Sequence, residues 1–519
     1  MSFTSVPFLL LVAAGLLLYR IVPQKLRWCV LLAVSCVFYL SGGISRLWYL
    51  LFTGLSTYGA GLLLGRLNAR RKSLPPEQKK VGGAKIKNQK RLVVLAAVLL
   101  NFGLLYGVKY WDFTAGAINQ AAGTALPQLN LVLPLGLSFY MFQSVGYVID
   151  CFRDKYPPQR NILKYLLFVS FFPQMVQGPI SRYDQLAPQL TAGKTITADD
   201  LKYGIQLAMW GYLKKLVVAD RASVVVSTVF STPEEYGGAV IAFGVLFYCI
   251  QLYFDFSGGI DITRGVAEMF GIHVVENFRR PIFATSLTDY WRRWHITLGA
   301  WMRDYVFYPM SLSKPLGKLG KLTRRKIGGK LGKIIPTSIA TFTVYFIIGI
   351  WHGANFRYVF FGFWNGALIT GAFLLDGTFV KMKNRLGITG KEGWYHGFQM
   401  LRTMVLVFIG RYVSRAPRLL TAFSMLWTTV SRPQLSQLRD GILLKLGLGG
   451  RELAVVAVGV LVLLAVEGAQ EKGVAIRKAM ERQNLLIQWL GILVPLLVLL
   501  VFGILRDSTI SAEFIYKQF

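Results

Sequence analysis

The sequence contains few charged residues, and acidic residues are especially scarce. Only 16% of its 519 residues are charged, and 25 Asp and Glu stand against 58 Lys and Arg. A soluble domain carries about 25% charged residues. This chain is instead 54% hydrophobic, with a mean hydropathy of +0.47. The composition argues against a set of soluble domains and predicts one large helical membrane domain.

Residue types that usually carry chemistry are also scarce. The four cysteines, Cys29, Cys36, Cys151 and Cys249, form no CxxC pair and lie in or beside apolar segments. That placement is typical of small buried hydrophobic side chains. The sequence has no GxSxG motif, no Walker loop and no convincing GxGxxG. It therefore gives no sign of a nucleotide-binding loop or a serine nucleophile elbow.

Long apolar runs are abundant. Residues 487–505 form one run of 19 residues without a charge, close to the ~20 that cross a bilayer as a helix. Several other runs are shorter than ~17 residues, and we expect these to be re-entrant or buried in the bundle. The candidate spans are residues 6–19, 28–40, 47–64, 92–110, 131–149, 165–180, 201–218, 238–256, 337–351, 358–375, 400–413, 419–430, 453–466 and 487–505.

Basic residues concentrate in two loops between apolar runs. Residues 66–91 hold ten Lys or Arg and one Glu, and residues 314–333 hold eight Lys or Arg and no acid. This is the pattern of cytoplasmic loops that contact anionic lipid headgroups, and it disfavours nucleic-acid binding. We expect these two loops and residues 468–482 to lie on the cytoplasmic side of a cell membrane. The N-terminus and the C-terminal tail are then both predicted to be extracytoplasmic.

Residues 277–309 differ from their surroundings. They contain five arginines, two aspartates, one histidine and three tryptophans, which makes them too polar for a lipid-facing span and too aromatic for an ordinary loop. Ser286 or Thr288 is a candidate cap for a short helix here. We expect interfacial or re-entrant helices that line a polar cavity inside the bundle.

Only four histidines are present, and two of them stand in promising places. His295 lies in the unusual segment, and His352 ends an apolar run. An ionisable residue at membrane depth is costly and usually marks a function, and histidine is the commonest general acid or base. His273 and His396 have no supporting cluster. We expect no metal site, because neither His295 nor His352 has a second ligand at i+3 or i+4.

Asp255 and Asp261 flank the small residues 257–259. Such a sequence permits close backbone approach, and it favours a helix kink over a substrate tunnel.

With these residues collected, the chain resembles the membrane-bound O-acyltransferase superfamily. It is most similar to the bacterial branch that includes the alginate O-acetylation and teichoic-acid D-alanylation membrane subunits. Six motifs in order carry the resemblance. They are PLGLSFYMFQSVGYVID (134–150), QGPISRYDQLAPQL (177–190), GYLKKLVVADR (211–221), YFDFSGGIDITRG (253–265), NFRRPIFATSLTDYWRRWHITLGAWMRDYVFYP (277–309) and IWHGANFRYVFFGFWNG (350–366).

The resemblance implies an all-α polytopic bundle with a central funnel or tunnel. It implies that His352 is catalytic and that His295 is the second characteristic histidine. Acyl transfer from a thioester to a hydroxyl needs a base and oxyanion donors. We expect His352 to be the base, with His295 and Asn355 orienting or polarising the substrate. The same motifs supply the further supporting candidates Trp351, Arg303 and Asp304.

The C-terminal tail resembles the aromatic tail of the small single-span partner in teichoic-acid D-alanylation systems. We expect residues 1–486 to form the acyltransferase domain and residues 487–519 to be a fused helix and tail. The resemblance implies that Tyr516 accepts the acyl group transiently and relays it outward. The alternative is an interfacial aromatic tail, since Tyr and Phe are common at membrane boundaries.

The sequence thus predicts a membrane O-acyltransferase, with acetylation of an extracytoplasmic polysaccharide or cell-wall polymer as its function. The thioester donor is a cytoplasmic acyl-CoA (for example acetyl-CoA) or acyl carrier protein, and no bound cofactor is expected. The family implies a serine-hydrolase-like partner outside. D-alanyl transfer to teichoic acid is the nearest alternative, and a membrane transporter is the alternative from another class. The sequence does not choose the polymer, the acyl group or the donor.

Overall fold

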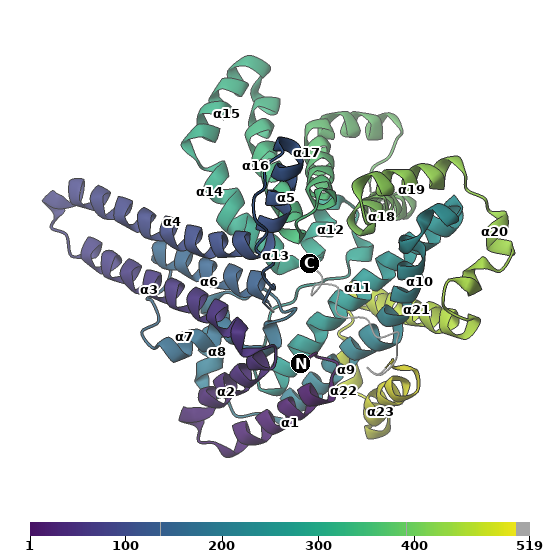
Figure 1. Ribbon diagram of the computed structural model, residues 1–519, viewed down its shortest axis with the longest axis horizontal. Helices are drawn as coiled ribbons and strands as arrows, with labels where there is room; N and C mark the ends of the chain where they lie inside the picture. Colours follow the sequence, from purple (N-terminus) through teal and green to yellow (C-terminus); the bar gives the residue numbers. More distant parts are fainter. Residues whose placement is uncertain (135, 391, 505–519) are drawn as a thin grey trace. The chain divides into compact units, whose positions relative to one another are not determined.

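The computed structural model describes residues 1–134, 136–390 and 392–504, with the side chains of residues 330 and 331 excepted. Within this part of the chain the fold is all-α, and the only β-type pairing is an isolated bridge between Phe278 and Trp294. The described residues form two compact units, one made of residues 1–211 and 259–275 and one of residues 212–258 and 276–504. The helices of both units are labelled in Figure 1.

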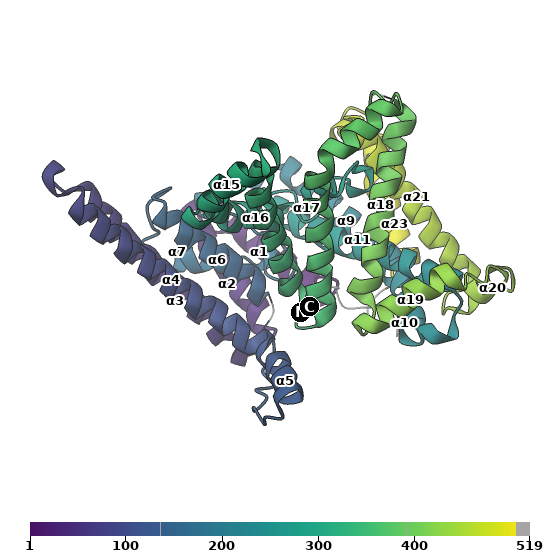
Figure 2. The same cartoon turned by 90° about the horizontal axis from the view of Figure 1, so that it is seen from above.

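The first unit is built around the long neighbouring helices α3 and α4, which pack on α6. Figures 1 and 2 show α3 and α4 side by side along most of their length. Its elements are α1 (Val6–Ile21), η1 (Gln24–Leu26), α2 (Arg27–Leu40), η2 (Ile44–Arg46), α3 (Leu47–Lys72), η3 (Pro76–Gln78), α4 (Val81–Lys109), α5 (Trp111–Ala122), α6 (Leu137–Phe152), α7 (Ile162–Ser170), η4 (Phe172–Gln174), α8 (Tyr183–Ala192) and nearly all of α9 (Ala198–Tyr212).

The second unit contains both candidate histidines. Helix α11 (Gly238–Met269) belongs to it as far as residue 258. The other elements are η5 (Leu213–Ala219), α10 (Asp220–Ser231), η6 (Pro233–Glu235), η7 (Pro281–Phe283), α12 (Leu287–Arg293), α13 (Ile296–Met302), η8 (Arg303–Phe307), α14 (Tyr308–Ser311), α15 (Lys314–Ile327), α16 (Gly329–His352), α17 (Phe356–Arg385), α18 (Gly393–Arg415), α19 (Leu419–Ser431), α20 (Ser436–Arg439), η9 (Ile442–Lys445), α21 (Gly450–Glu471), α22 (Ile476–Glu481) and α23 (Leu485–Phe502).

Seven helices in the described part of the chain are long and apolar enough to cross a bilayer. The multi-pass membrane fold expected from the sequence is therefore confirmed. Some of the shorter expected spans, such as α1, α7 and α19, are apolar helices below the usual spanning length. The spanning helices are Ile44–Lys72, Val81–Lys109, Gly238–Met269, Gly332–His352, Phe356–Arg385, Gly450–Glu471 and Leu485–Phe502.

Two expected spans are not continuous helices. Helix α6 begins only at Leu137, because Pro134 and the left-handed Gly136 precede it. Helix α7 ends at Ser170, and the chain passes through η4 into buried irregular backbone up to residue 182. Pro173 lacks the N–H that a continued helix would need. Irregular backbone at membrane depth is tolerated where protein buries it.

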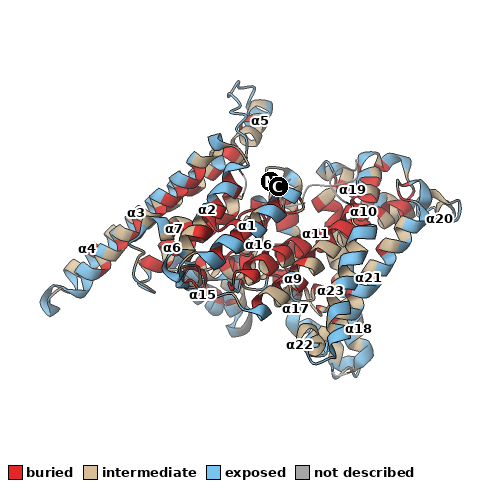
Figure 3. Cartoon of the chain, turned by 90° about the horizontal axis from the view of Figure 1, so that it is seen from below, coloured by how far each residue is buried: buried red, intermediate tan, exposed pale blue. Residues whose placement is uncertain are grey.

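Helix α11 continues well beyond the expected span of residues 238–256. The small residues 257–259 do not interrupt it, and it runs unbroken through both Gly258 and Gly259. Figure 3 shows many buried residues along α11, whereas α23 has none.

The cysteines are all free thiols, of which Cys151 is buried and Cys36 is exposed.

Helices α16 and α17 form a close antiparallel hairpin, with His352 at its tip. Gly349 and Gly362 face each other across the contact, and a Cβ added to Gly349 would lie 2.6 Å from the Cα of Gly362. Small residues let two helices approach closely without lipid between them. This contact therefore fixes the end of α16 that carries the histidine.

A buried charge cluster joins the π-helix η5 to α11. The Lys215 ammonium lies 2.8 Å from Asp220 Oδ1 and 2.5 Å from Asp255 Oδ1, and all three side chains are at most 2% exposed. Beside it, Lys214 donates to the Ser257 hydroxyl at 3.1 Å. Burying a charge without a partner costs free energy of folding. The Lys215 ammonium therefore offsets the cost of burying the two carboxylates.

We predict that Lys215→Ala destabilises the protein by about 3–5 kcal/mol, because Asp220 and Asp255 would lose their counter-ion. Thermal unfolding of the purified protein in detergent measures this. Lys381→Ala, at an exposed lysine of the same unit, is the control and should leave the midpoint nearly unchanged. Equal midpoints for the two variants would contradict the assignment of a buried triad.

Candidate functional site

A short antiparallel pairing builds the frame of the site. Phe278 and Trp294 form a bridge, the Arg279 N–H donates to the Arg293 carbonyl at 2.9 Å, and the Ile296 N–H donates to the Asn277 carbonyl at 3.0 Å. Residues 277–280 thereby run beside residues 293–296. The pairing connects two chain segments that a sequence pattern would assign to separate loops.

The backbone of this frame is strained at two places. Arg280 and His295 both have φ of +48°, in the left-handed region that non-glycine residues rarely adopt. Each stands directly before a helical element, η7 or α13. Strained residues of this kind cluster at functional sites and persist only where the surroundings hold them. At His295 the holding contacts come from Asn277.

The cap expected at the start of the short helix is confirmed. Ser286 precedes α12, and its hydroxyl accepts the Asp289 N–H at 3.1 Å. The helix ends in the Arg-Arg pair just before Trp294. Because the cap fixes the start of α12, the helix also determines the positions of Trp294 and His295, which directly follow it.

The side chain of Asn277 is the polar centre of the site. Its Oδ1 accepts the Thr297 N–H at 3.0 Å and the Thr297 hydroxyl at 2.9 Å, and lies 3.2 Å from His295 Nδ1. A backbone N–H can only donate, so the oxygen of the carboxamide must face this side. His295 Nδ1 must then carry a proton, and the lone pair is on Nε2.

His295 is enclosed by aromatic rings. It is 2% exposed, Phe256 meets its ring edge-on at 4.9 Å between centroids, and Trp351 lies at 5.9 Å. Burial lowers the pKa of His295 well below its ordinary value, and the nearby His352 lowers it further. His295 is therefore neutral at physiological pH, which agrees with the single-proton tautomer set by Asn277.

His352 is brought to the same place by the hairpin. It is the last residue of α16, it is half-buried, and its ring lies 5.0 Å from Trp351. Trp351 thus contacts both histidines, which are 57 residues apart in the sequence. Gly353 follows because Tyr358 leaves no room for a side chain, and a Cβ there would lie 2.6 Å from the Tyr358 ring.

The supporting residues named from the sequence divide into two groups. Trp351 is at the centre of the site. Asn355 instead caps α17, since its Oδ1 accepts the Arg357 N–H at 3.0 Å. Arg303 and Asp304 lie on η8 and pair with each other at 3.3 Å near the surface. Only Arg303 of this pair lines the cavity that reaches His295.

A cavity of about 350 Å³ opens onto His295. Its walls come from α12, α13 and η8 on one side and from the middle of α16 and α17 on the other. Arg292, Arg303 and Thr288 supply polar groups, while Trp291 and Ile348 are among the apolar ones. Mostly apolar pockets of this size with a few placed polar groups are typical of small-molecule sites.

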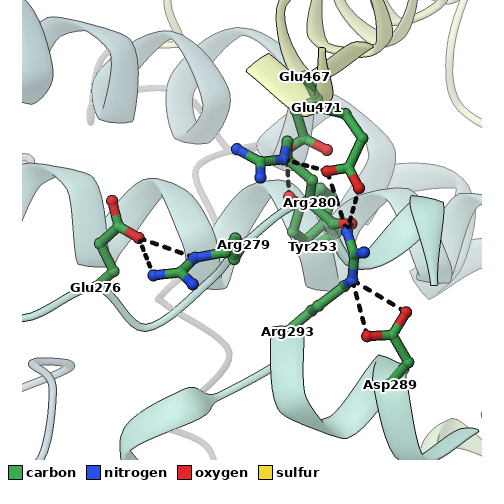
Figure 4. Close-up of polar contacts among 8 residues, drawn as sticks. All are labelled: Tyr253, Glu276, Arg279, Arg280, Asp289, Arg293, Glu467 and Glu471. Carbon is green, nitrogen blue, oxygen red and sulfur yellow. Dashed lines mark hydrogen bonds and ion pairs between the residues drawn. The ribbon is translucent and has the colours of Figure 1, made fainter. Parts of the chain in front are cut away.

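An ion-pair network includes Arg293, the residue before Trp294, and Figure 4 shows it. The Glu471 carboxylate binds Arg280 at 2.5 Å and Arg293 at 2.9 Å, and Arg293 also binds Asp289 at 3.1 Å. Tyr253 donates a hydrogen bond to the buried Glu467 one turn earlier on α21. The network ties the arginines before Trp294 to the end of α21.

Sequence reasoning missed several of these residues. Asn277 gave no signal, because one asparagine in a polar segment has no distinctive spacing. Glu467 and Arg411 did carry a signal, since each is an ionisable residue within an apolar run. Arg411 donates to the Tyr290 hydroxyl at 2.8 Å and lies 5.2 Å from the centre of the Trp294 ring. It therefore supports the wall beside His295.

The remaining candidates lie elsewhere. His273 is largely exposed, with its Nε2 3.9 Å from Asp200, and His396 is exposed. Tyr516 lies outside the described residues. The last described residue before the tail, Ile504, donates its N–H to the Leu216 carbonyl at 3.1 Å, and Arg221 donates to the Phe502 carbonyl at 2.6 Å. Across the described residues, no group of three or more His, Cys, Asp or Glu is placed to hold a metal ion.

We predict that Asn277→Ala lowers kcat by about tenfold or more, since one orienting hydrogen bond of ~1.4 kcal/mol corresponds to a factor of ten in rate. Thr297→Val is the matched control, because it removes one donor to Asn277 but leaves the Asn277–His295 contact. Steady-state acyl transfer with the purified variants measures both. An unchanged kcat in Asn277→Ala would show that the tautomer of His295 does not matter.

The chain is similar in sequence to known membrane enzymes. A model of the membrane-bound O-acyltransferase family (MBOAT) matches residues 154–324, which include His295. The chain is 31% identical to the protein named "Probable alginate O-acetylase AlgI" of Pseudomonas syringae pv. tomato, over 79% of this chain and 71% of that protein.

More distant relatives carry other names. The chain is 28% identical to the peptidoglycan O-acetyltransferase of Helicobacter pylori, over 54% of this chain and 55% of the relative. It is also 28% identical to the teichoic acid D-alanyltransferase of Bacillus subtilis, over 54% of this chain and 67% of the relative. Taken with its all-α, multi-pass fold, these similarities show that the chain belongs to the membrane-bound O-acyltransferase family and is an O-acyltransferase.

Proposed function

We propose that this enzyme O-acetylates an extracytoplasmic polysaccharide or cell-wall polymer, using an acetyl thioester from the cytoplasm. The observation that carries the proposal is that Trp351 contacts both His295 and His352, and that a cavity reaches His295. Because the chain is an acyltransferase, the transporter hypothesis is set aside.

The reaction needs a proton acceptor and donors for the developing oxyanion. His352 is proposed as the base that removes the proton of the attacking hydroxyl. The hydroxyl oxygen bonds to the thioester carbonyl carbon, the carbon–sulfur bond breaks, and the thiolate leaves. The ring of Trp351 contacts both imidazoles. Because an indole N–H can only donate, Trp351 is proposed to stabilise the oxyanion.

The tautomer of His295 gives it a more specific role than general polarisation. With its proton on Nδ1, Nε2 can accept a hydrogen bond but cannot donate one. A carbonyl is polarised by donors, so His295 is better suited to hold the attacking hydroxyl or to share its proton with His352. We therefore propose that His295 orients the nucleophile.

The cavity at His295 is proposed to hold the thioester arm of the donor. Its wall on α16 runs from Thr341 to Ile348, between the basic end of that helix and His352. With residues 314–333 on the cytoplasmic side, as the charge pattern predicts, the cavity is on the donor side of the histidines. Arg292 and Arg303 in its lining suit an anionic donor.

Tyr516 is proposed to take the acyl group from the site and pass it outward. The support is indirect: α23 ends in hydrogen bonds to Leu216 and Arg221, within the unit that holds both histidines. From Ile504 to Tyr516 an extended chain reaches roughly 40 Å. A serine-hydrolase-like protein on the outer side is the proposed recipient, as the family resemblance implies.

Transfer of D-alanyl to teichoic acid remains the second candidate, because a relative carries that name. Acetyl is favoured because the similarity to the alginate O-acetylase extends over 79% of this chain, against 54% for the D-alanyltransferase. Offering both thioesters in parallel separates the candidates.

We predict that His352→Ala lowers acyl transfer by about 10²–10⁴-fold, the usual contribution of a general base. His396→Ala, at an exposed histidine of the same unit, should keep full activity. Release of free thiol from acetyl-CoA, in the presence of polymer, measures the rate. A His352→Ala variant with wild-type activity would remove this residue from the chemistry.

A separate prediction concerns the tail. Mass spectrometry of the tryptic peptide 507–517, from protein supplied with acetyl-CoA, should show an acetyl adduct on Tyr516. The adduct should be absent in His352→Ala and in Tyr516→Phe. Full polymer acetylation by Tyr516→Phe would contradict the relay and leave the tail as an anchor.

A further inference from the structure

A second cavity in the same unit is separate from the one at His295. It has a volume of about 400 Å³ and lies between the segment before η7 and the connection from α21 to α22. Its lining comprises Glu276, Arg280, Gln470, Gly473, Val474, Ala475, Ile476, Arg477 and Lys478. The proposed mechanism assigns it no role.

Positive charge predominates around this cavity. Arg280, Arg477 and Lys478 line it, and Glu276 is the one carboxylate among the lining residues. The Glu276 carboxylate already binds Arg279 at 3.2 Å, outside the lining (Figure 4). The cavity is therefore electrostatically suited to an anion rather than to a cation or a neutral sugar.

Glu471 does not cancel this excess of positive charge. Its single carboxylate is shared between Arg280 and Arg293, with Arg280 bound through Nε (Figure 4). A guanidinium has five N–H donors, so Arg280 keeps donors for a ligand. Glu471 instead holds this guanidinium in place, which reduces the ordering cost when an anion binds.

We propose that this cavity binds a phosphate ester, whose oxygens are held by Arg280, Arg477 and Lys478. Guanidinium groups match phosphate oxygens in bidentate geometry, and lysine adds a point charge. The volume lies in the range of small-molecule sites. The charge pattern places residues 468–482 on the cytoplasmic side, where phosphate esters are available both on soluble carriers and on anionic lipids.

The position of the cavity links its occupant to the reacting histidine. Glu276 and Arg280 flank Asn277, whose Oδ1 sets the tautomer of His295. Arg293, joined to Arg280 through Glu471, directly precedes Trp294 and His295. The occupant would be the phosphate of the thioester carrier, an assignment that rests on the proposed function. The bound donor then contacts the segment that orients His295.

The test compares binding and turnover in the full-length protein. The double variant Arg477→Ala/Lys478→Ala removes two of the three cations. Arg482→Ala removes an exposed positive charge at the C-terminal end of α22 without touching the cavity lining, and serves as the control. Arg477→Lys/Lys478→Arg keeps the charge. Inorganic pyrophosphate and coenzyme A are titrated against each protein in phosphatidylcholine nanodiscs, with the unfolding midpoint as readout.

We expect the apparent affinity for pyrophosphate to fall tenfold or more in the double alanine variant and to stay within twofold in the control and the charge-conserving variant. A parallel comparison replaces part of the phosphatidylcholine by phosphatidylglycerol. Tighter binding of coenzyme A than of pyrophosphate identifies the soluble carrier as the natural occupant. Stabilisation of the wild type, but not of the double variant, by phosphatidylglycerol identifies a lipid headgroup. Either result supports the phosphate site.

Equal responses of the wild type, the double variant and the control to all three phosphate sources would overturn the proposal. Turnover distinguishes this failure from a failure of the proposed function. If the site serves the donor, the double variant raises KM for acetyl-CoA about tenfold and leaves kcat unchanged. Binding without turnover of any thioester by the wild type would count against the proposed donor while the phosphate site stands.

Discussion

The carboxamide of Asn277 is the contact on which the geometry of the candidate site depends. In a low-dielectric interior a polar group without a partner costs several kcal/mol, so the three donors around its Oδ1 hold one another in place. Thr297 fixes the direction of the amide, and the amide then fixes the proton of His295. The left-handed backbone at His295 persists because this cluster and the pairing of Phe278 with Trp294 hold it on both sides.

Buried charges with polar partners also stabilise the helices around the site. On α11, Asp255 is paired with Lys215, and the next residue, Phe256, packs edge-on against His295. The ion pair therefore restrains the helix that supplies one wall of the histidine pocket. On the other wall, Arg411 supports Tyr290 and Trp294. A chain with so little charge places much of its buried charge where it holds the aromatic enclosure rigid.

The paired segments 277–280 and 293–296 contribute lining residues to both cavities. His295 and Trp294 face the cavity proposed for the thioester arm, whereas Arg280 faces the cavity proposed for a phosphate ester. The Glu471 carboxylate bridges arginines from both segments. Recognition of an anion and orientation of the histidine, as proposed, both use these paired segments, so that donor binding can affect the chemistry without any large movement of helices.

Some features of this protein followed from the sequence because they depend on local composition. Residues 485–502 of the last apolar run are helical, as expected for an apolar segment in lipid, and Ser286 caps the helix that follows it. The motifs around His295 and His352 identified the family and made these two histidines the catalytic candidates. Other features depend on contacts between distant segments. Only the tertiary structure shows that Trp351 contacts both histidines and that the side chain of Asn355 caps α17. It also shows that α11 continues through residues 257–259. The sequence determines which side chains are costly to bury, but their partners lie tens to hundreds of residues away, as Asn277, Glu471 and Lys215 show, and tertiary packing alone brings those partners together.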